Sequence, residues 1–235
     1  MNLAARVDLR GPVARLVIPQ ALRLLEDVPL SDPAVRDYLR FGIPLLLEGD
    51  VGSEGNVSVV IDALDLPLAE AQLGQAAGTG SFTIARFHTH LSGVMALFLA
   101  SAGLSIETKA PSQTLGPVAV RLQNSVFNMQ QHDLIMNDNS VMKFQGRVGL
   151  DRRLEASVEV PVNVTMLRRF GLSDRDAQLV QNQRLLVGAT GTIDKPRMDD
   201  QAFWKRVGEI VAEYVKRRAI QEFGNLLRDS LKPKK

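Results

Sequence analysis

The sequence predicts a mainly β protein: a twisted antiparallel meander sheet that forms a groove, with inserted helices and a long C-terminal amphipathic helix. Two patterns predict it. Short runs of alternating apolar and polar residues follow one another, separated by polar turns, as in antiparallel strands in series. The last segment instead spaces its apolar residues as a helix does. We divide the 235 residues into a β-groove domain with inserted helices, 1–198, and a basic C-terminal helix, 199–235.

The first part of the chain reads as strands around one short helix. Residues 3–18 predict a strand or a bent hairpin that breaks at Gly11-Pro12. Residues 31–46 open with a Ser-Asp cap and a proline in the first turn, which predicts a helix, and Gly42 and Pro44 keep it short. The segment 54–64 then alternates as a strand.

A second strand covers 78–90 and places Phe82 and Ile84 on one face. Residues 91–103 form a compact apolar stretch of helical length. Beyond it the β character is nearly continuous, with strands predicted over 116–127 and 132–136.

The clearest hairpin in the sequence joins residues 141–150 to 154–162. One face of the pair is apolar and the other is charged. This division is typical of an antiparallel sheet with one covered face. A helical stretch, 164–183, a strand, 185–193, and the final helix, 199–231, complete the order.

Composition excludes several classes of site. The chain has no cysteine, which rules out thiolate zinc sites, a disulfide framework and a cysteine nucleophile. Aromatic residues are only 5%, so apolar surface is mostly aliphatic. No segment reaches the roughly 20 apolar residues of a membrane-spanning helix, and no signal peptide is visible. Strand alternation from the first residues fits either the C-terminal part of something longer or a complete small protein.

Charge is distributed unevenly. Residues 203–235 hold nine Lys/Arg and four Asp/Glu, a net +5, and the rest hold 19 basic and 22 acidic residues, a net −3. A basic tail indicates a phosphate-bearing partner, and the slightly acidic body disfavours nucleic acid. We therefore consider an anionic membrane surface, against the alternative of a simple solvated helix face. The residues assigned to this surface are Lys205, Arg206, Lys216, Arg217, Arg218 and Arg228.

The sequence suggests no catalytic centre, cofactor or metal. His88 and His90 share a strand face, but zinc requires three or four ligands and no further one lies nearby. The glycine-rich stretches 78–81 and 188–192 lack the spacing of a phosphate-binding loop, so we interpret them as turns or bulges. Asp199 and Asp200 suit the N-terminus of the last helix. We expect a protein that is not an enzyme.

A longer pattern resembles a known family. The run 134–171 followed by 185–199 is similar to the C-terminal region of AsmA-like, TamB-related proteins of the bacterial envelope, and the resemblance extends over about residues 30–210. The positions that carry it are Gly146, Gly149, Leu150, Asp151, Leu154, Val158, Pro161 and Val162, then Gly191, Thr192, Pro196 and Asp199. Family members usually carry an N-terminal membrane anchor, which this sequence does not show.

The resemblance implies a repeating β-groove that shelters phospholipid acyl chains, on the periplasmic side of a bacterial cell envelope. Its partners would be phospholipid or another acyl-chain lipid, a membrane surface and the remainder of a longer chain. The alternative is a structural or protein-interaction module of the envelope, with a fully packed β core and no lipid. The residues expected to contact lipid are Phe82, Ile84, Met142, Phe144, Val148, Leu150, Leu154, Val158 and Val160.

Overall fold

The fold was analysed in a computed structural model of the chain. It describes residues 5–39, 41, 54–88, 96–98, 100, 113–135, 141–180 and 183–230. For Tyr38, His88 and residues 222–230 it describes the backbone alone.

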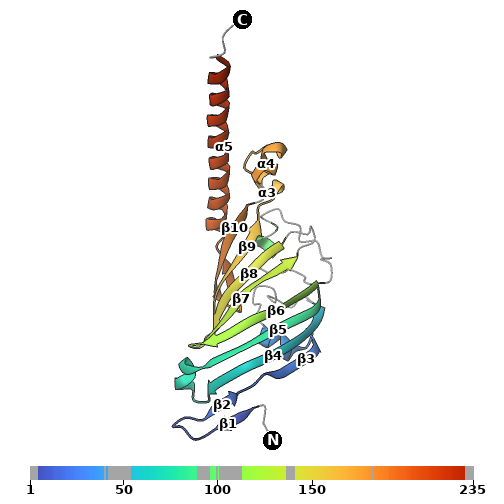
Figure 1. Cartoon of the computed structure of the whole chain (residues 1–235), viewed down its shortest axis with the longest axis vertical. Coiled ribbons are helices and arrows are strands. Elements are labelled where there is room, and N and C mark those ends of the chain that lie inside the picture. Colours follow the sequence, from blue (N-terminus) through green and yellow to red (C-terminus); the bar gives the residue numbers. More distant parts are fainter. Residues whose placement is uncertain are drawn as a thin grey trace.

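In the part of the chain that the structure describes, 11 strands form one antiparallel sheet (Figure 1). Its order is β1-β2-β4-β5-β6-β7-β8-β9-β10-β11, and β3 pairs with β4 beside β2. Nearly every strand therefore pairs with its neighbour in sequence, and the fold is the predicted open meander. The strands are β1 (Arg6–Asp8), β2 (Arg15–Ile18), β3 (Leu22–Pro29), β4 (Glu54–Pro67), β5 (Ala77–His88), β6 (Gln113–Gln123), β7 (Val126–Ile135), β8 (Val141–Gly149), β9 (Arg153–Pro161), β10 (Arg184–Thr192) and β11 (Lys195–Met198).

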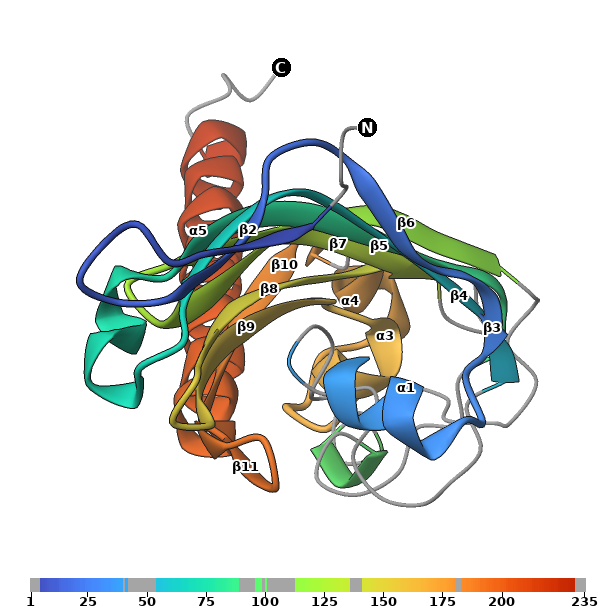
Figure 2. The same cartoon turned by 90° about the horizontal axis from the view of Figure 1, so that it is seen from below.

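The sheet curls into an arch, and helices lie beneath it (Figure 2). Residues 96–98 and 100 are also helical. We call the covered side of the sheet its inner face and the opposite side its outer face. The helices are α1 (Pro33–Leu39), the 3-10 helix η1 (Glu70–Gln75), α3 (Val164–Arg168), α4 (Asp174–Val180) and α5 (Asp200–Ser230).

Local chemistry explains two features of the meander. Asn124 and Ser125, with φ of 52° and 62°, form the two-residue turn between β6 and β7. Positive φ at both turn residues gives the twist that matches antiparallel strands. In β7, a bulge between Met129 and His132 absorbs residues that the sequence had suggested would separate two strands.

Small residues accompany the curl of the sheet. A Cβ on Gly80 would lie 2.5 Å from the backbone oxygen of Val60, and one on Gly146 would lie 2.7 Å from the Cβ of Ala156. These strands approach each other more closely on the inner face than ordinary side chains permit. Glycine at such positions lets a strand bend.

One large hydrophobic cluster covers much of the inner face. It runs from Leu30 through the central strands to Val211 in α5. The helical segment 164–183 contributes to it as two short helices, which the chain separates at Gly171 with φ of +83°. Because Phe203, Val207 and Ile210 belong to the same core, the first half of α5 packs with the sheet.

Candidate functional site

Eight of the nine residues predicted to contact lipid are buried in the core. They lie on β5, β8 and β9, and each is at most 5% exposed. Leu150, in the turn after β8, is partly exposed. Alternation therefore placed these side chains on the correct face, and the protein itself covers that part of the face.

The cover comes from segments far away in the sequence. Helix α1 contributes Val35 and Leu39 to the same buried cluster. Helix α3 contributes Leu167, and the helical residues 96–98 contribute Phe98. The ring of Phe98 also packs edge-on against Phe203, with 4.8 Å between centroids. These side chains occupy the position that an acyl chain would take over the central strands.

A second part of the inner face is less covered. Several large apolar residues of β2, β3, β4, β6 and β7 are partly exposed, and strand pairing puts them on the inner side with buried Ile18, Phe82 and Val118. We call seven of them the inner strip: Leu16, Leu22, Ile61, Leu64, Leu66, Val120 and Phe127. The sequence analysis did not single these residues out, because their alternation looks the same as that of the buried strands.

A pocket of about 420 Å³ crosses β2, β4, β5 and β6. We call it the outer pocket. Its lining is mostly apolar and includes Val17, Ala63, Ala77 and Thr79. Two lining residues are charged, Asp65 and Arg121. The rest of the lining consists of the uncharged residues Ile18, Pro19, Leu64, Gly78, Leu122 and Gln123.

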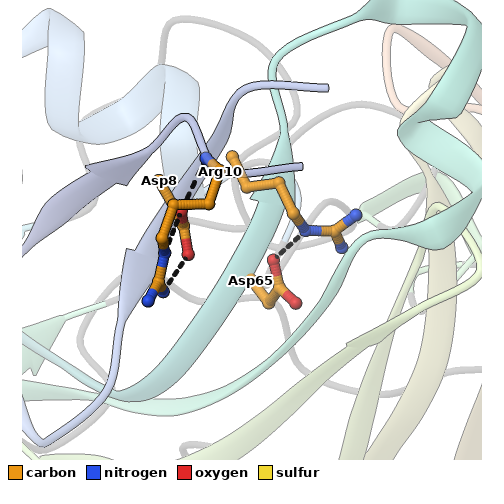
Figure 3. Close-up of polar contacts among 4 residues, drawn as sticks. Asp8, Arg10 and Asp65 are labelled. Carbon is orange, nitrogen blue, oxygen red and sulfur yellow. Dashed lines mark hydrogen bonds and ion pairs between the residues drawn. The ribbon is translucent and has the colours of Figure 1, made fainter. Parts of the chain in front are cut away.

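One ion pair joins β2 to the pocket lining, and a second lies in the adjacent hairpin (Figure 3). The Nε of Arg15 donates a hydrogen bond of 2.5 Å to Oδ1 of Asp65. In the adjacent hairpin, Arg10 donates two side-chain hydrogen bonds to Asp8, of 2.9 and 2.6 Å. These bonds hold the pKa of the Asp8 carboxyl far below its usual range. The Asp8 carboxylate is therefore ionised in the neutral pH range.

The residues assigned to an anionic surface lie along α5. Lys205 and Lys216 are exposed, whereas Arg206 pairs with Glu209 at 2.7 Å and Arg217 pairs with Glu213 at 2.6 Å. Arg218 pairs with Asp176 of α4 at 2.5 Å. Arg228 lies outside the described side chains. The second half of α5 projects beyond the rest of the fold (Figure 1).

Metal and membrane-span signatures do not appear in the described part of the chain. None of its His, Asp and Glu residues form a group of three that could hold an ion. His90 falls outside the described residues, so the predicted His pair is not placed. Among the described helices, none combines the length and apolar character that a membrane span needs.

Comparison with known proteins gives no relative. No family model, curated protein or solved structure matches the chain.

Proposed function

We propose that this protein handles lipid without catalysis, on the periplasmic side of a bacterial cell envelope. Acyl chains would lie along the inner strip, while the buried residues of β5, β8 and β9 support the curved sheet from beneath. The observation that carries the proposal is an unclosed, curled sheet whose inner face leaves the large apolar side chains of the inner strip partly exposed.

The geometry of the strip suits a hydrocarbon chain. Neighbouring strands lie about 4.8 Å apart, so the path from β2 across β4, β5 and β6 to β7 spans about 19 Å. Each methylene buried along such a path contributes about 0.8 kcal/mol. Aliphatic side chains fix no particular orientation, which would let a chain slide along the sheet.

Native mass spectrometry of the purified protein, followed by lipid extraction, tests this function. Ile61→Glu and Val120→Glu place a carboxylate in the strip at partly exposed positions and should abolish lipid binding. The control is Thr190→Glu, an exposed position on the outer face of β10. Lipid that persists in both strip variants, or is absent from the wild type, contradicts the proposal.

A second candidate function is a structural or protein-interaction module of the envelope. The complete burial of Ile84, Met142 and Val158 favours it, because a face that is covered by the protein itself has no room for a ligand. This candidate predicts a stable, compact protein without lipid, whose exposed strands or outer face bind another protein.

A further inference from the structure

We infer that the outer pocket binds a single-chain anionic amphiphile, with the chain in the apolar hollow and the carboxylate or phosphate headgroup at Arg121. This site is separate from the inner strip, and the inference does not depend on the proposed function.

Strand alternation places the pocket on the outer face. The lining consists of three consecutive residues at each of the four strands, centred on Ile18, Leu64, Gly78 and Leu122. Ile18 and Leu122 point into the core, at 5% and 6% exposure, so the flanking side chains point outward. The next inner-face residues of these strands, such as Val120, do not line the pocket. Leu64 therefore contributes to both sites, and the backbone of the sheet separates the rest of the pocket from the inner strip.

The lining is suited to hydrocarbon. Short side chains form the floor, because Ala63 and Thr79 are paired across β4 and β5, and Ala77 lies two residues before Thr79. Val17 and Pro19 close one side. A volume of about 420 Å³ falls in the range of small-molecule sites, about 300–1,000 Å³.

The charges around the pocket favour an anion. Arg15 neutralises Asp65, the carboxylate in the lining. No described carboxylate pairs with Arg121, which is exposed at the β6 side. At the opposite side, Arg6 of β1 pairs in register with Val17, so it faces outward beside the lining, where its charge acts on Asp8. Among the described residues of the lining, Arg121 therefore supplies a positive charge without an ion-pair partner.

Calorimetric titration of the full chain with laurate, dodecyl phosphate, dodecanol, dodecyltrimethylammonium and inorganic phosphate tests the inference, with each amphiphile kept below its micelle concentration. Laurate and dodecyl phosphate should bind, dodecanol should bind more weakly, the ammonium compound should bind more weakly than dodecanol, and inorganic phosphate should not bind. Arg121→Gln should weaken the affinity for laurate about fivefold, as expected when an exposed ion pair of up to about 1 kcal/mol is lost. The affinity for dodecanol should not change. Arg197→Gln, an exposed arginine outside the pocket, should change neither.

Filling the pocket provides the second test. Ala77→Trp fills the hollow at an exposed position and should reduce laurate binding more than tenfold, whereas Thr190→Trp, exposed on the same face but outside the pocket, should not. Equal affinity in wild type and Ala77→Trp overturns the inference. Loss of laurate binding in Ile61→Glu but not in Ala77→Trp also overturns it and assigns the ligand to the inner strip. Loss in Ala77→Trp but not in Ile61→Glu supports the outer pocket whatever the fate of the proposed function.

Discussion

Two glycines illustrate how closely individual residues set the shape of the sheet. A Cβ at Gly146 would lie 2.7 Å from the Cβ of Ala156, whereas one at Gly188 would meet no atom within 4 Å. Both lie in strands, so the difference is one of packing alone. Gly146 belongs to the close approach of β8 to β9, and Gly188 lies on the exposed side of β10.

We therefore expect Gly146→Ala to lower the free energy of unfolding by about 1–3 kcal/mol, the usual effect of overpacking. Gly188→Ala should change it by less than about 0.5 kcal/mol. Urea denaturation of the two variants measures both. A Gly146→Ala protein as stable as the wild type would show that β8 and β9 separate easily, and that the glycine is not what permits the close approach.

His132 is a polar residue placed among apolar ones. Its ring stacks on Phe144, with 5.8 Å between ring centroids, and its buried Nε2 has no hydrogen-bond partner among the described residues. Burial lowers the pKa of the imidazole, while the contacts of its Nδ1 with the carbonyl of Gln130 and of the ring with Asp133 act in the opposite direction. The folded protein thus keeps this histidine neutral at a pH where the unfolded chain protonates it.

This residue should make the protein less stable in mild acid. Below the unfolded pKa of about 6.5, the unfolded state binds more protons than the folded state, so the free energy of unfolding falls as the pH falls toward the folded pKa. His132→Phe preserves the ring and should flatten this dependence between pH 7 and pH 5, measured by urea denaturation. An unchanged pH profile in the variant would mean that other groups cause the acid sensitivity.

At this scale the sequence predicts the face of a side chain better than its exposure. Ile84 and Ile61 both alternate within apolar strands, yet Ile84 is fully buried and Ile61 is partly exposed. What distinguishes them is the segment that packs above each one. That segment comes from elsewhere in the chain, so strand periodicity carries no record of it.

Among the elements, α5 is attached to α4 by a polar contact. The hydroxyl of Tyr214 donates a hydrogen bond of 2.8 Å to Asp176, and Arg218 pairs with the same carboxylate at 2.5 Å. A hydrogen bond from Ser173, at the start of α4, and the one from Tyr214 lower the pKa of Asp176. The contact is therefore present above the usual Asp pKa of about 3.9 and is lost as the pH falls through the lowered folded value.

Arg218→Gln should loosen α4 from α5. Amide hydrogen exchange within residues 174–180 should become faster at neutral pH, because the carboxylate of Asp176 loses its charged partner. Arg217→Gln is the matched control, since Arg217 pairs with Glu213 in the same helix. Equal exchange of α4 in both variants would show that Tyr214 and the apolar contacts suffice to hold the two helices together.

Element boundaries were predictable where local signals were strong. Residues 141–150 and 154–162 became β8 and β9, and α1 begins at Pro33, directly after the Ser-Asp cap at 31–32, as expected. The sequence did not indicate that Leu22–Pro29 would be a strand, because its apolar residues do not alternate strictly. Bulges explain this: the register of β3 on β4 shifts twice, so no single period describes it.

For the whole molecule, the core joins the sheet to the first half of α5. Phe203, Val207, Ile210 and Val211 are each at most 9% exposed and pack in the same cluster as β9 and β10. From Val215 to Gln221, α5 is exposed. The sheet and the first turns of α5 therefore share one hydrophobic cluster and should unfold together.

Truncation separates these two parts of α5. The chain 1–199 loses the buried face of the helix and should not give a cooperative urea transition, since it uncovers apolar residues on β9 and β10. The chain 1–221 keeps every described contact between α5 and the rest of the fold and should unfold cooperatively, with a stability close to that of the full chain. A stable 1–199 protein would show that the helix is an independent unit.

The open meander was predictable because its strands pair with their sequence neighbours, so local turn chemistry largely determines the order. How much of the inner face the helices cover was not predictable from the sequence. Whether α1, Phe98 and α3 would close over the inner face depends on long-range packing, and the nine residues expected to meet lipid were assigned without that information.

Because each strand of the meander pairs mainly with its neighbours in sequence, strands can be added at an edge of this sheet without changing the pairing of the central strands. A strand placed beside β1 would hydrogen-bond to one existing edge and would leave the pairing of β4 through β10 untouched. A sheet with this connectivity can gain or lose hairpins at its edges, because the hydrogen bonds between the strands already paired stay the same.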